Sequence, residues 1–188
     1  FYGSTGAIAL KKPIVGMAPT STGKGYWLVA SDGGILAFGD AKFYGSTGAI
    51  ALKEPIVGMA PTSTGKCYWL GGSDGGIFSF GHAKFLGSTG SLNLSQRIVG
   101  MAPTLSGNGY WFVSADGGVF GFGDAQFFGS AADGNPNPVV GISATKKGMG
   151  YRVVRSDGSV TAFGTAGVGG GFASGRLNAP VVGIVTAS

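Results

Sequence analysis

Three pairs of adjacent aromatic residues are the part of this sequence best suited to bind a ligand. Each pair is a Tyr followed by a Trp, and each stands in the same sequence context. Aromatic planes stack on the apolar faces of sugars, the phenol and indole tips form hydrogen bonds, and equivalent sites on one polymer add avidity. In the alternative interpretation, the same side chains fill the space between packed sheets. The candidate ligand-binding residues are Tyr26, Trp27, Tyr68, Trp69, Tyr110 and Trp111.

Other residue types offer little for catalysis. His82 is the only histidine, and no serine stands in the strand-turn-helix context of a nucleophile elbow. An Asp precedes a glycine in each of several similar stretches, where its carboxylate caps a turn by accepting hydrogen bonds from backbone amides. Calcium would need a second carboxylate beside it, such as Asp40 or Asp124. We therefore predict that the chain is not an enzyme and has no catalytic residues, no metal ligands and no cofactor.

The composition argues against several classes of partner. The formal net charge is +5, but Lys and Arg are scattered singly or in pairs such as Lys11-Lys12, without the basic stripe typical of nucleic-acid binding. No apolar run approaches the roughly 18 residues of a membrane span, so no membrane insertion is expected. Cys67 is the only cysteine, which excludes a disulfide within the chain.

The 39 glycines among 188 residues, with only 11% charged residues, favour a turn-rich β protein.

A repeat of 42 residues accounts for the whole chain. Residues 1–42 and 43–84 differ at few positions, and residues 85–126 keep the main features. Residues 127–167 form a shorter repeat with Arg152 where Trp27 stands in the first, and residues 168–188 are a partial copy. The sequence therefore predicts one repeat domain spanning residues 1–188.

Each repeat contains four candidate strands, which in the first copy are residues 13–20, 26–31, 34–39 and 42–47. The second and third form a β-hairpin, because the Asp32-Gly33-Gly34 stretch supplies glycines that accept positive φ. The same hairpin recurs at residues 68–80, 110–122 and 151–163. No segment shows a helical period over about ten residues.

Four short strands in about 42 residues match one blade of a β-propeller, whereas a solenoid has shorter coils or a helix in each repeat. We predict an all-β propeller of four-stranded blades, with residues 13–20 innermost and residues 43–47 outermost. A glycine recurs inside the inner strand, where several backbones would converge near the axis. These glycines are Gly16, Gly58, Gly100, Gly141 and Gly183.

The predicted strands do not fill whole blades at the two ends of the chain. The chain opens with an outer-strand segment and finishes with an inner-strand segment at residues 180–184. Propeller rings are commonly closed by a blade built from both termini. A fifth blade completed by residues outside this chain, a ring of four blades with spare strands, and pairing with another molecule all remain open.

Two stretches carry a resemblance to a known group of proteins. Gly-Tyr-Trp-Leu-Val-Ala-Ser-Asp-Gly-Gly-Ile and Phe-Gly-Asp-Ala-Lys-Phe-Tyr-Gly-Ser-Thr-Gly resemble a tandem repeat of secreted and cell-surface bacterial proteins, which occurs beside enzymes or wall-associated modules. The likeness covers nearly the whole chain, and Arg152 and Thr165 depart from it. The resemblance implies a propeller-like, non-catalytic part with an extracellular or cell-surface location.

Taken together, these features predict a non-catalytic extracellular module that binds a polysaccharide or a cell-wall glycan. The first alternative is a structural or assembly element of an extracellular polymer, because an open strand edge is a template for a neighbouring chain. That alternative includes self-association through the terminal strands. The second alternative is an accessory domain of a secreted hydrolase.

Overall fold

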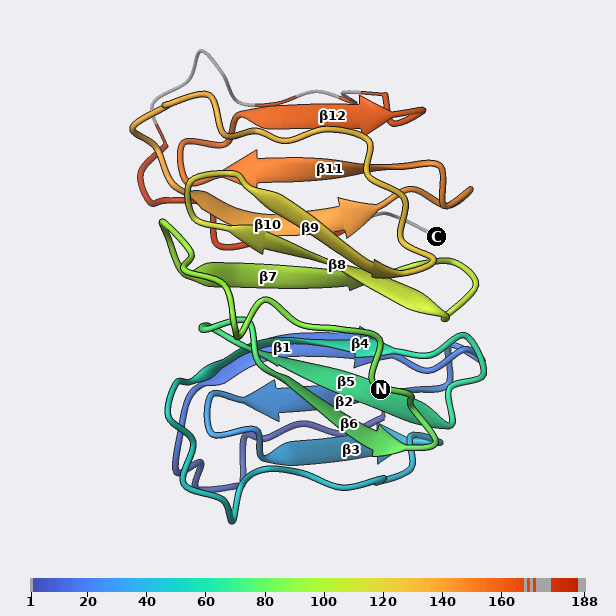
Figure 1. The fold of residues 1–188 in the computed structure, drawn as a ribbon. Helices are drawn as coiled ribbons and strands as arrows, with labels where there is room; N and C mark the ends of the chain where they lie inside the picture. The colour runs from blue at the N-terminus through green and yellow to red at the C-terminus, as the bar shows by residue number, and fades with distance from the viewer. Residues whose placement is uncertain (1, 168, 170, 172–176, 186–188) are drawn as a thin grey trace.

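The computed structural model describes residues 2–167, 169, 171 and 177–185, which form four antiparallel sheets (Figure 1). Each sheet has three strands that follow one another in the chain, and the described residues contain no helix. The sheets consist of β1 (Ile14–Pro19), β2 (Gly25–Ala30) and β3 (Ile35–Gly39); β4 (Ile56–Pro61), β5 (Cys67–Gly72) and β6 (Ile77–Gly81); β7 (Ile98–Pro103), β8 (Gly109–Ser114) and β9 (Val119–Gly123); and β10 (Val139–Ala144), β11 (Gly150–Arg155) and β12 (Val160–Gly164). The predictions of an all-β repeat protein and of a hairpin in each repeat are confirmed.

The hairpin turn depends on glycine. Gly33 has φ of 76°, and the equivalent Gly75, Gly117 and Gly158 are also in the left-handed region. A Cβ on Gly33 would in addition lie 1.7 Å from Thr47 Oγ1. Both the backbone conformation and the space therefore exclude a larger residue here.

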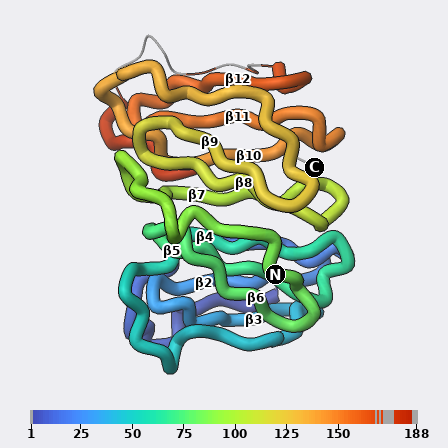
Figure 2. The backbone as a smooth tube through the Cα atoms, in the orientation of Figure 1, coloured from blue at the N-terminus to red at the C-terminus, as the bar shows by residue number. Residues whose placement is uncertain are grey.

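The first strands of the sheets lie side by side near the centre of the molecule. β1 contacts β4, β4 contacts β7, and β7 contacts β10, while β3 and β12 lie at opposite ends in the view of Figure 2. A Cβ on Gly100 would lie 3.5 Å from the Cα of Gly141, and one on Gly141 would lie 3.5 Å from the Cα of Gly183. The first strand of each sheet thus contacts the first strand of the neighbouring sheet, and its glycine permits the close approach of their backbones.

The predicted fourth strand is wrong. Residues 42–47 form no strand: several of their backbone groups bond to side chains, and the amide of Thr47 donates to the Gly33 carbonyl in the hairpin turn. The Lys42 carbonyl accepts a hydrogen bond from Trp27 Nε1 at 2.8 Å, and the amide of Tyr44 donates to the Tyr68 hydroxyl at 3.1 Å. Because one partner belongs to the first sheet and the other to the second, the segment packs between consecutive sheets and does not extend an edge.

The described residues do not form a closed ring. No contact comparable to those between neighbouring first strands joins β10 to β1. Residues 2–5 form no strand, so the expected outer strand at the start of the chain is also wrong for these residues, and Phe1 lies outside the described ones. The carbonyl of Gly3 accepts a hydrogen bond from the Tyr26 hydroxyl, as that of Gly45 does from Tyr68. The opening segment is therefore the counterpart of the segment between sheets.

The second and third sheets show a complementary change of side-chain size. Gly71 occupies the position of Val29 and Val113, and Phe112 occupies the position of Leu28 and Leu70. A Cβ on Gly71 would lie 2.6 Å from Phe112 Cε1. The phenyl ring of the third sheet thus fills the volume that a valine would take in the second.

This fit predicts the behaviour of one double variant. Gly71→Val should lower the free energy of unfolding by about 1–3 kcal/mol, because the added methyl groups overpack the interface. Phe112→Leu should restore most of that loss, since leucine is the residue that faces Val29 from the second sheet. Urea unfolding of both single variants and the double variant measures the coupling; additive effects would contradict the contact.

Candidate functional site

Each Trp of the predicted binding pairs packs against a Tyr of the next sheet. The rings are tilted, at the separations found for favourable aromatic pairs. The centroids are 5.8 Å apart for Trp27 and Tyr68, 5.2 Å for Trp69 and Tyr110, and 5.5 Å for Trp111 and Tyr151. The same contact therefore joins the first sheet to the second, the second to the third, and the third to the fourth.

The polar tips of these rings are bound to the segments between sheets. The indole Nε1 of each Trp donates to a backbone carbonyl at 2.8 Å, and the acceptors are Lys42, Lys84 and Gln126. The hydroxyl of Tyr68 donates to the Gly45 carbonyl at 2.7 Å. Burial raises the pKa of the Tyr68 phenol above its usual value. The hydrogen-bonding groups that were predicted to hold a sugar thus hold the backbone.

The structure places the predicted ligand-binding residues inside the sheet array. Trp27, Tyr68, Trp69, Tyr110 and Trp111 are fully buried, and only Tyr26 is partly exposed. A buried ring presents no face to a sugar. The geometry therefore supports the alternative interpretation of these residues, in which they form the core between sheets.

Arg152 occupies the Trp position of the fourth sheet and reproduces its hydrogen bond. Its Nε donates to the Gly167 carbonyl at 2.7 Å, as the indole of Trp27 does to Lys42. The described residues include no Tyr of a following sheet against which it could stack. In the fourth sheet, the planar guanidinium of Arg152 therefore takes the place that an indole occupies in each of the first three sheets.

The carboxylates at the turns have local partners. The amide of Gly34 donates to Asp32 Oδ1 at 2.9 Å, so the predicted turn cap is confirmed. Asp40 accepts hydrogen bonds from the hydroxyls of Thr22 and Thr20, which lower the pKa of its carboxyl below the usual 3.8. No group of three or more His, Cys, Asp or Glu suited to a metal ion occurs in the part of the chain that the structure describes.

The second repeat differs from the first at two neighbouring positions. A Cβ on Gly25 would lie 2.5 Å from the Phe38 carbonyl oxygen and 2.6 Å from Asp40 Oδ1, so both the backbone and the carboxylate crowd this position. In the second repeat Cys67 replaces the glycine and the exposed His82 replaces the aspartate. The Cys67 thiol lies 3.2 Å from Thr62 Oγ1. Replacement of the aspartate thus removes one of the close contacts that a side chain at the glycine position would make.

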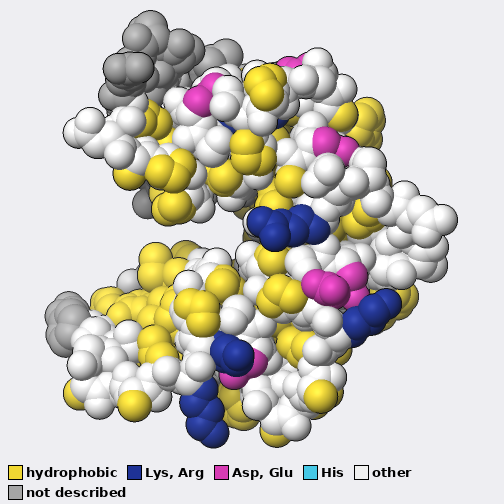
Figure 3. Space-filling view, turned by 90° about the vertical axis from the view of Figure 1, so that its left-hand side faces the viewer, with side chains coloured by type: hydrophobic (Ala, Val, Ile, Leu, Met, Phe, Trp, Pro, Cys, Tyr) yellow, Lys and Arg dark blue, Asp and Glu magenta, His cyan; other side chains and the backbone are white. Residues whose placement is uncertain are grey.

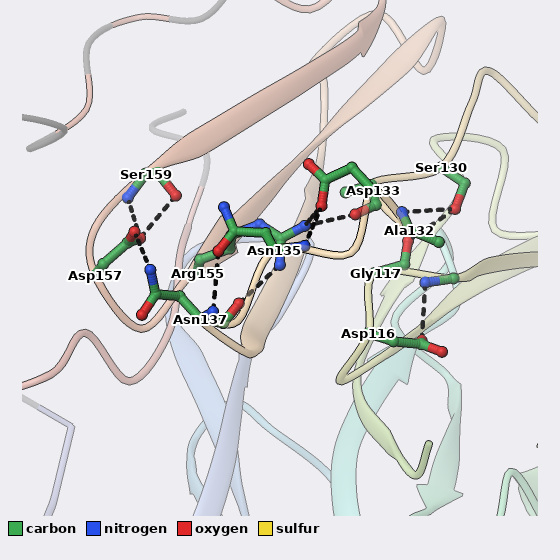
Figure 4. A network of polar contacts seen from close by, with 12 residues as sticks. Asp116, Gly117, Ser130, Ala132, Asp133, Asn135, Asn137, Arg155, Asp157 and Ser159 are labelled. Carbon is green, nitrogen blue, oxygen red and sulfur yellow. Dashed lines mark hydrogen bonds and ion pairs between the residues drawn. The ribbon is translucent and has the colours of Figure 1, made fainter. Parts of the chain in front are cut away.

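The fourth repeat contains a polar cluster around a buried arginine that the sequence analysis did not identify (Figure 4). Arg155 is 2% exposed, and its guanidinium donates to the carbonyls of Asn137 and Ala131. It also pairs with Asp133 at 2.7 Å, although the carboxylate is 58% exposed. Small residues occupy the position in the other repeats: Ala30, Gly72 and Ser114. A large charged residue at a position that is small in every other repeat was the feature of the sequence that could have indicated this cluster.

A shallow cleft lies beside this cluster. It measures about 350 Å³ and is bordered by Asn137, Ser156, Asp157 and residues 177–180. The hydrogen-bonding groups of Asp157 are directed to the protein: its carboxylate accepts from Asn137 Nδ2 and from the amide and hydroxyl of Ser159. The carboxylate of Asp157 at this cleft therefore already accepts hydrogen bonds from groups of the protein.

One face of the first sheet is an apolar surface that no other sheet covers in the described residues. Cross-strand pairing places six side chains on this face, which we call the first-sheet face: Met17, Pro19, Tyr26, Leu28, Leu36 and Phe38. Met17 is 66% exposed, whereas the equivalent Met59 is 7% exposed because the first sheet covers it. Figure 3 shows a wide opening between the two halves of the molecule, with hydrophobic side chains along its lower wall.

Comparison with known proteins gives no family for the chain. No protein-family model matches the sequence, and no curated protein matches it. Among the described residues, no helix is long and apolar enough to span a lipid bilayer. The first-sheet face is therefore a candidate interaction surface on the strength of its geometry alone.

In the polar cluster, we expect Arg155 to contribute more to the free energy of unfolding than Asp133 does. Arg155→Met keeps an apolar stem but leaves buried carbonyl acceptors without donors, so we expect a loss of roughly 1–3 kcal/mol in the free energy of unfolding. Asp133→Asn affects only the exposed end of the ion pair and should cost less than about 1 kcal/mol. Urea titrations of the two variants compare the costs directly. An equal or larger effect of Asp133→Asn would contradict the assignment of Arg155 as an anchor for the loop carbonyls.

Proposed function

We propose that this chain is a non-catalytic structural module that serves as a rigid support in an extracellular or cell-surface assembly. The observation that carries the proposal is the repeated contact of Trp with Tyr between successive sheets. These aromatic pairs, and the hydrogen bonds at their tips, connect one repeat to the next. Such an architecture gains stability from each added neighbour, as in other repeat proteins.

The arrangement of the sheets supports a propeller-type array as the architecture of this module. The first strands are neighbours, the strand order in each sheet runs outward from them, and glycines permit their close packing. In our proposal each three-stranded sheet corresponds to one blade. The segment between sheets takes the place of the fourth strand that the sequence predicted.

The extracellular location rests on the resemblance of the repeat to those of secreted and cell-surface bacterial proteins. The presence of a single cysteine and the low charge are compatible with many locations and do not decide between them. Glycan binding through the Tyr-Trp strands is the weaker proposal, because the rings that would stack on a sugar are buried.

A structural module should tolerate the loss of a complete repeat. Removal of residues 1–42 takes away the first sheet with its preceding segment and leaves three intact sheets. We expect the remaining chain to unfold cooperatively, with a urea m-value lower by about a quarter, because m follows the surface exposed on unfolding. Circular dichroism during urea titration measures this change.

The matched control is a cut inside a repeat. Removal of residues 1–21 leaves the hairpin of β2 and β3 without its inner strand, so we expect proteolysis to trim this hairpin while the other sheets persist. An unfolded protein after removal of residues 1–42 would contradict a modular support. Retention of the intact chain on insoluble polysaccharides or isolated cell walls would favour glycan binding instead.

A further inference from the structure

Three features of the structure bear on one question, namely what could pack between the fourth sheet and the first beyond the residues that the structure describes. The first feature is the first-sheet face. Tyr26 and Leu28 are only partly buried, whereas their counterparts Tyr68 and Leu70 have no exposed surface because a preceding sheet packs on them. The exposed fraction differs most between Met17 and its counterpart Met59. The first sheet thus presents the receiving half of an interface that the chain forms repeatedly.

The second feature is Arg152, at the other end of the array. Its hydrogen bond to Gly167 holds the guanidinium where the indoles of the preceding sheets are held. The indole of Trp111 packs on Tyr151 of the next sheet. Arginine stacks on aromatic faces through its planar guanidinium. A Tyr of one further hairpin is therefore the group that Arg152 is placed to meet.

The third feature is the segment of residues 180–185. The amide of Val181 donates to the Ser156 carbonyl at 3.0 Å, as Val139 does to Ala115 and Ile98 does to Ser73. Gly183 lies against Gly141 in the manner of Gly141 against Gly100. This segment thus occupies the place of a fifth inner strand, yet Val182 is 89% exposed. In the other sheets the second strand of the sheet pairs with this inner strand.

We propose that the opening between the fourth and first sheets is a docking site for one β-hairpin of this repeat type. The inference rests on the proposed structural function and names its partner. The hairpin extends residues 180–185 into a sheet by strand pairing, its Tyr stacks on Arg152, and its Trp covers Tyr26 of the first-sheet face. The three exposed features are then buried by a single element. The interface continues the one already formed between the sheets of this chain.

An in-phase extension tests the proposal in the complete protein. Residues 180–188 align with residues 13–21, so a copy of residues 22–42 joined directly after Ser188 supplies the hairpin in register. We expect Tm to rise by about 5 °C or more, because the docked hairpin buries apolar surface on both neighbours. We also expect oxidation of Met17 by hydrogen peroxide to slow to the rate of Met59. Peptide mass spectrometry reads both methionines in one sample.

The matched control carries the same extension with serine in place of its Tyr and its Trp. This control should leave Tm and the oxidation of Met17 as in the unextended protein. Arg152→Ser in the protein with the intact extension should remove part of the gain in Tm. Addition of the hairpin as a cyclised peptide keeps the test informative if the extended chain does not fold.

Two results would overturn the proposal. The first is an unchanged Met17 oxidation rate with both the extension and the peptide. The second is protection of Met17 in the unextended protein that increases with protein concentration, because a second copy of the chain would then be the occupant. Neither result affects the truncation of residues 1–42, so failure of the docking site and failure of the structural function are distinguishable.

Discussion

The contact between an indole and the phenol of the next sheet is the interaction on which the array depends. Short antiparallel sheets are near the lower limit of independent stability, because a two-stranded hairpin alone is marginal and three strands need a hydrophobic face to bury. Each of the three interfaces between sheets contains a buried Trp whose Nε1 donates to a backbone carbonyl and a buried Tyr whose hydroxyl does the same. Full burial of such large rings supplies much of the apolar area that a small sheet lacks.

The same contact determines the path of the chain between sheets. The carbonyl of Lys84 accepts the indole hydrogen bond of the second sheet, and the carbonyl of Gly87 accepts the phenol hydrogen bond of the third. These hydrogen bonds hold the segment between the two sheets, and in the described residues no further strand pairs with the outer edge of β6. The aromatic contact and the path of the connecting segment are therefore linked.

The local structure was predictable from the sequence because it depends on neighbouring residues. Gly33 has a positive φ that suits a turn, continuous apolar runs flank this turn, and the repeat indicates that every copy behaves alike. The fate of residues 42–47 was not predictable, because Phe43 and Tyr44 have the composition of a strand. The amide of Tyr44 bonds instead to the Tyr68 hydroxyl, which lies 24 residues further along the chain in the second sheet. The role of Arg155 was hidden for the same reason, since its acceptors come from a loop about two dozen residues earlier.

The candidate site shows the limit of interpreting residues by type. A Tyr-Trp pair satisfies the chemistry of sugar binding and of sheet packing equally well, and only burial separates the two. The surface that remains open has no distinctive sequence: Met17 and Leu28 recur in the second repeat as Met59 and Leu70, where they are covered. The first-sheet face is open only because of its place at the start of the array, and the sequence of one repeat does not specify that place.

A double-mutant cycle on Trp69 and Tyr110 tests the central role of the aromatic contact most directly. The variants Trp69→Leu, Tyr110→Leu and the double variant are unfolded in urea, with Trp27 and Tyr110 as a control pair separated by one sheet. The account predicts a coupling free energy of about 0.5–1.5 kcal/mol for the first pair and additive effects for the control pair. Additive effects for Trp69 and Tyr110 would show that the sheets are held together by something other than this contact.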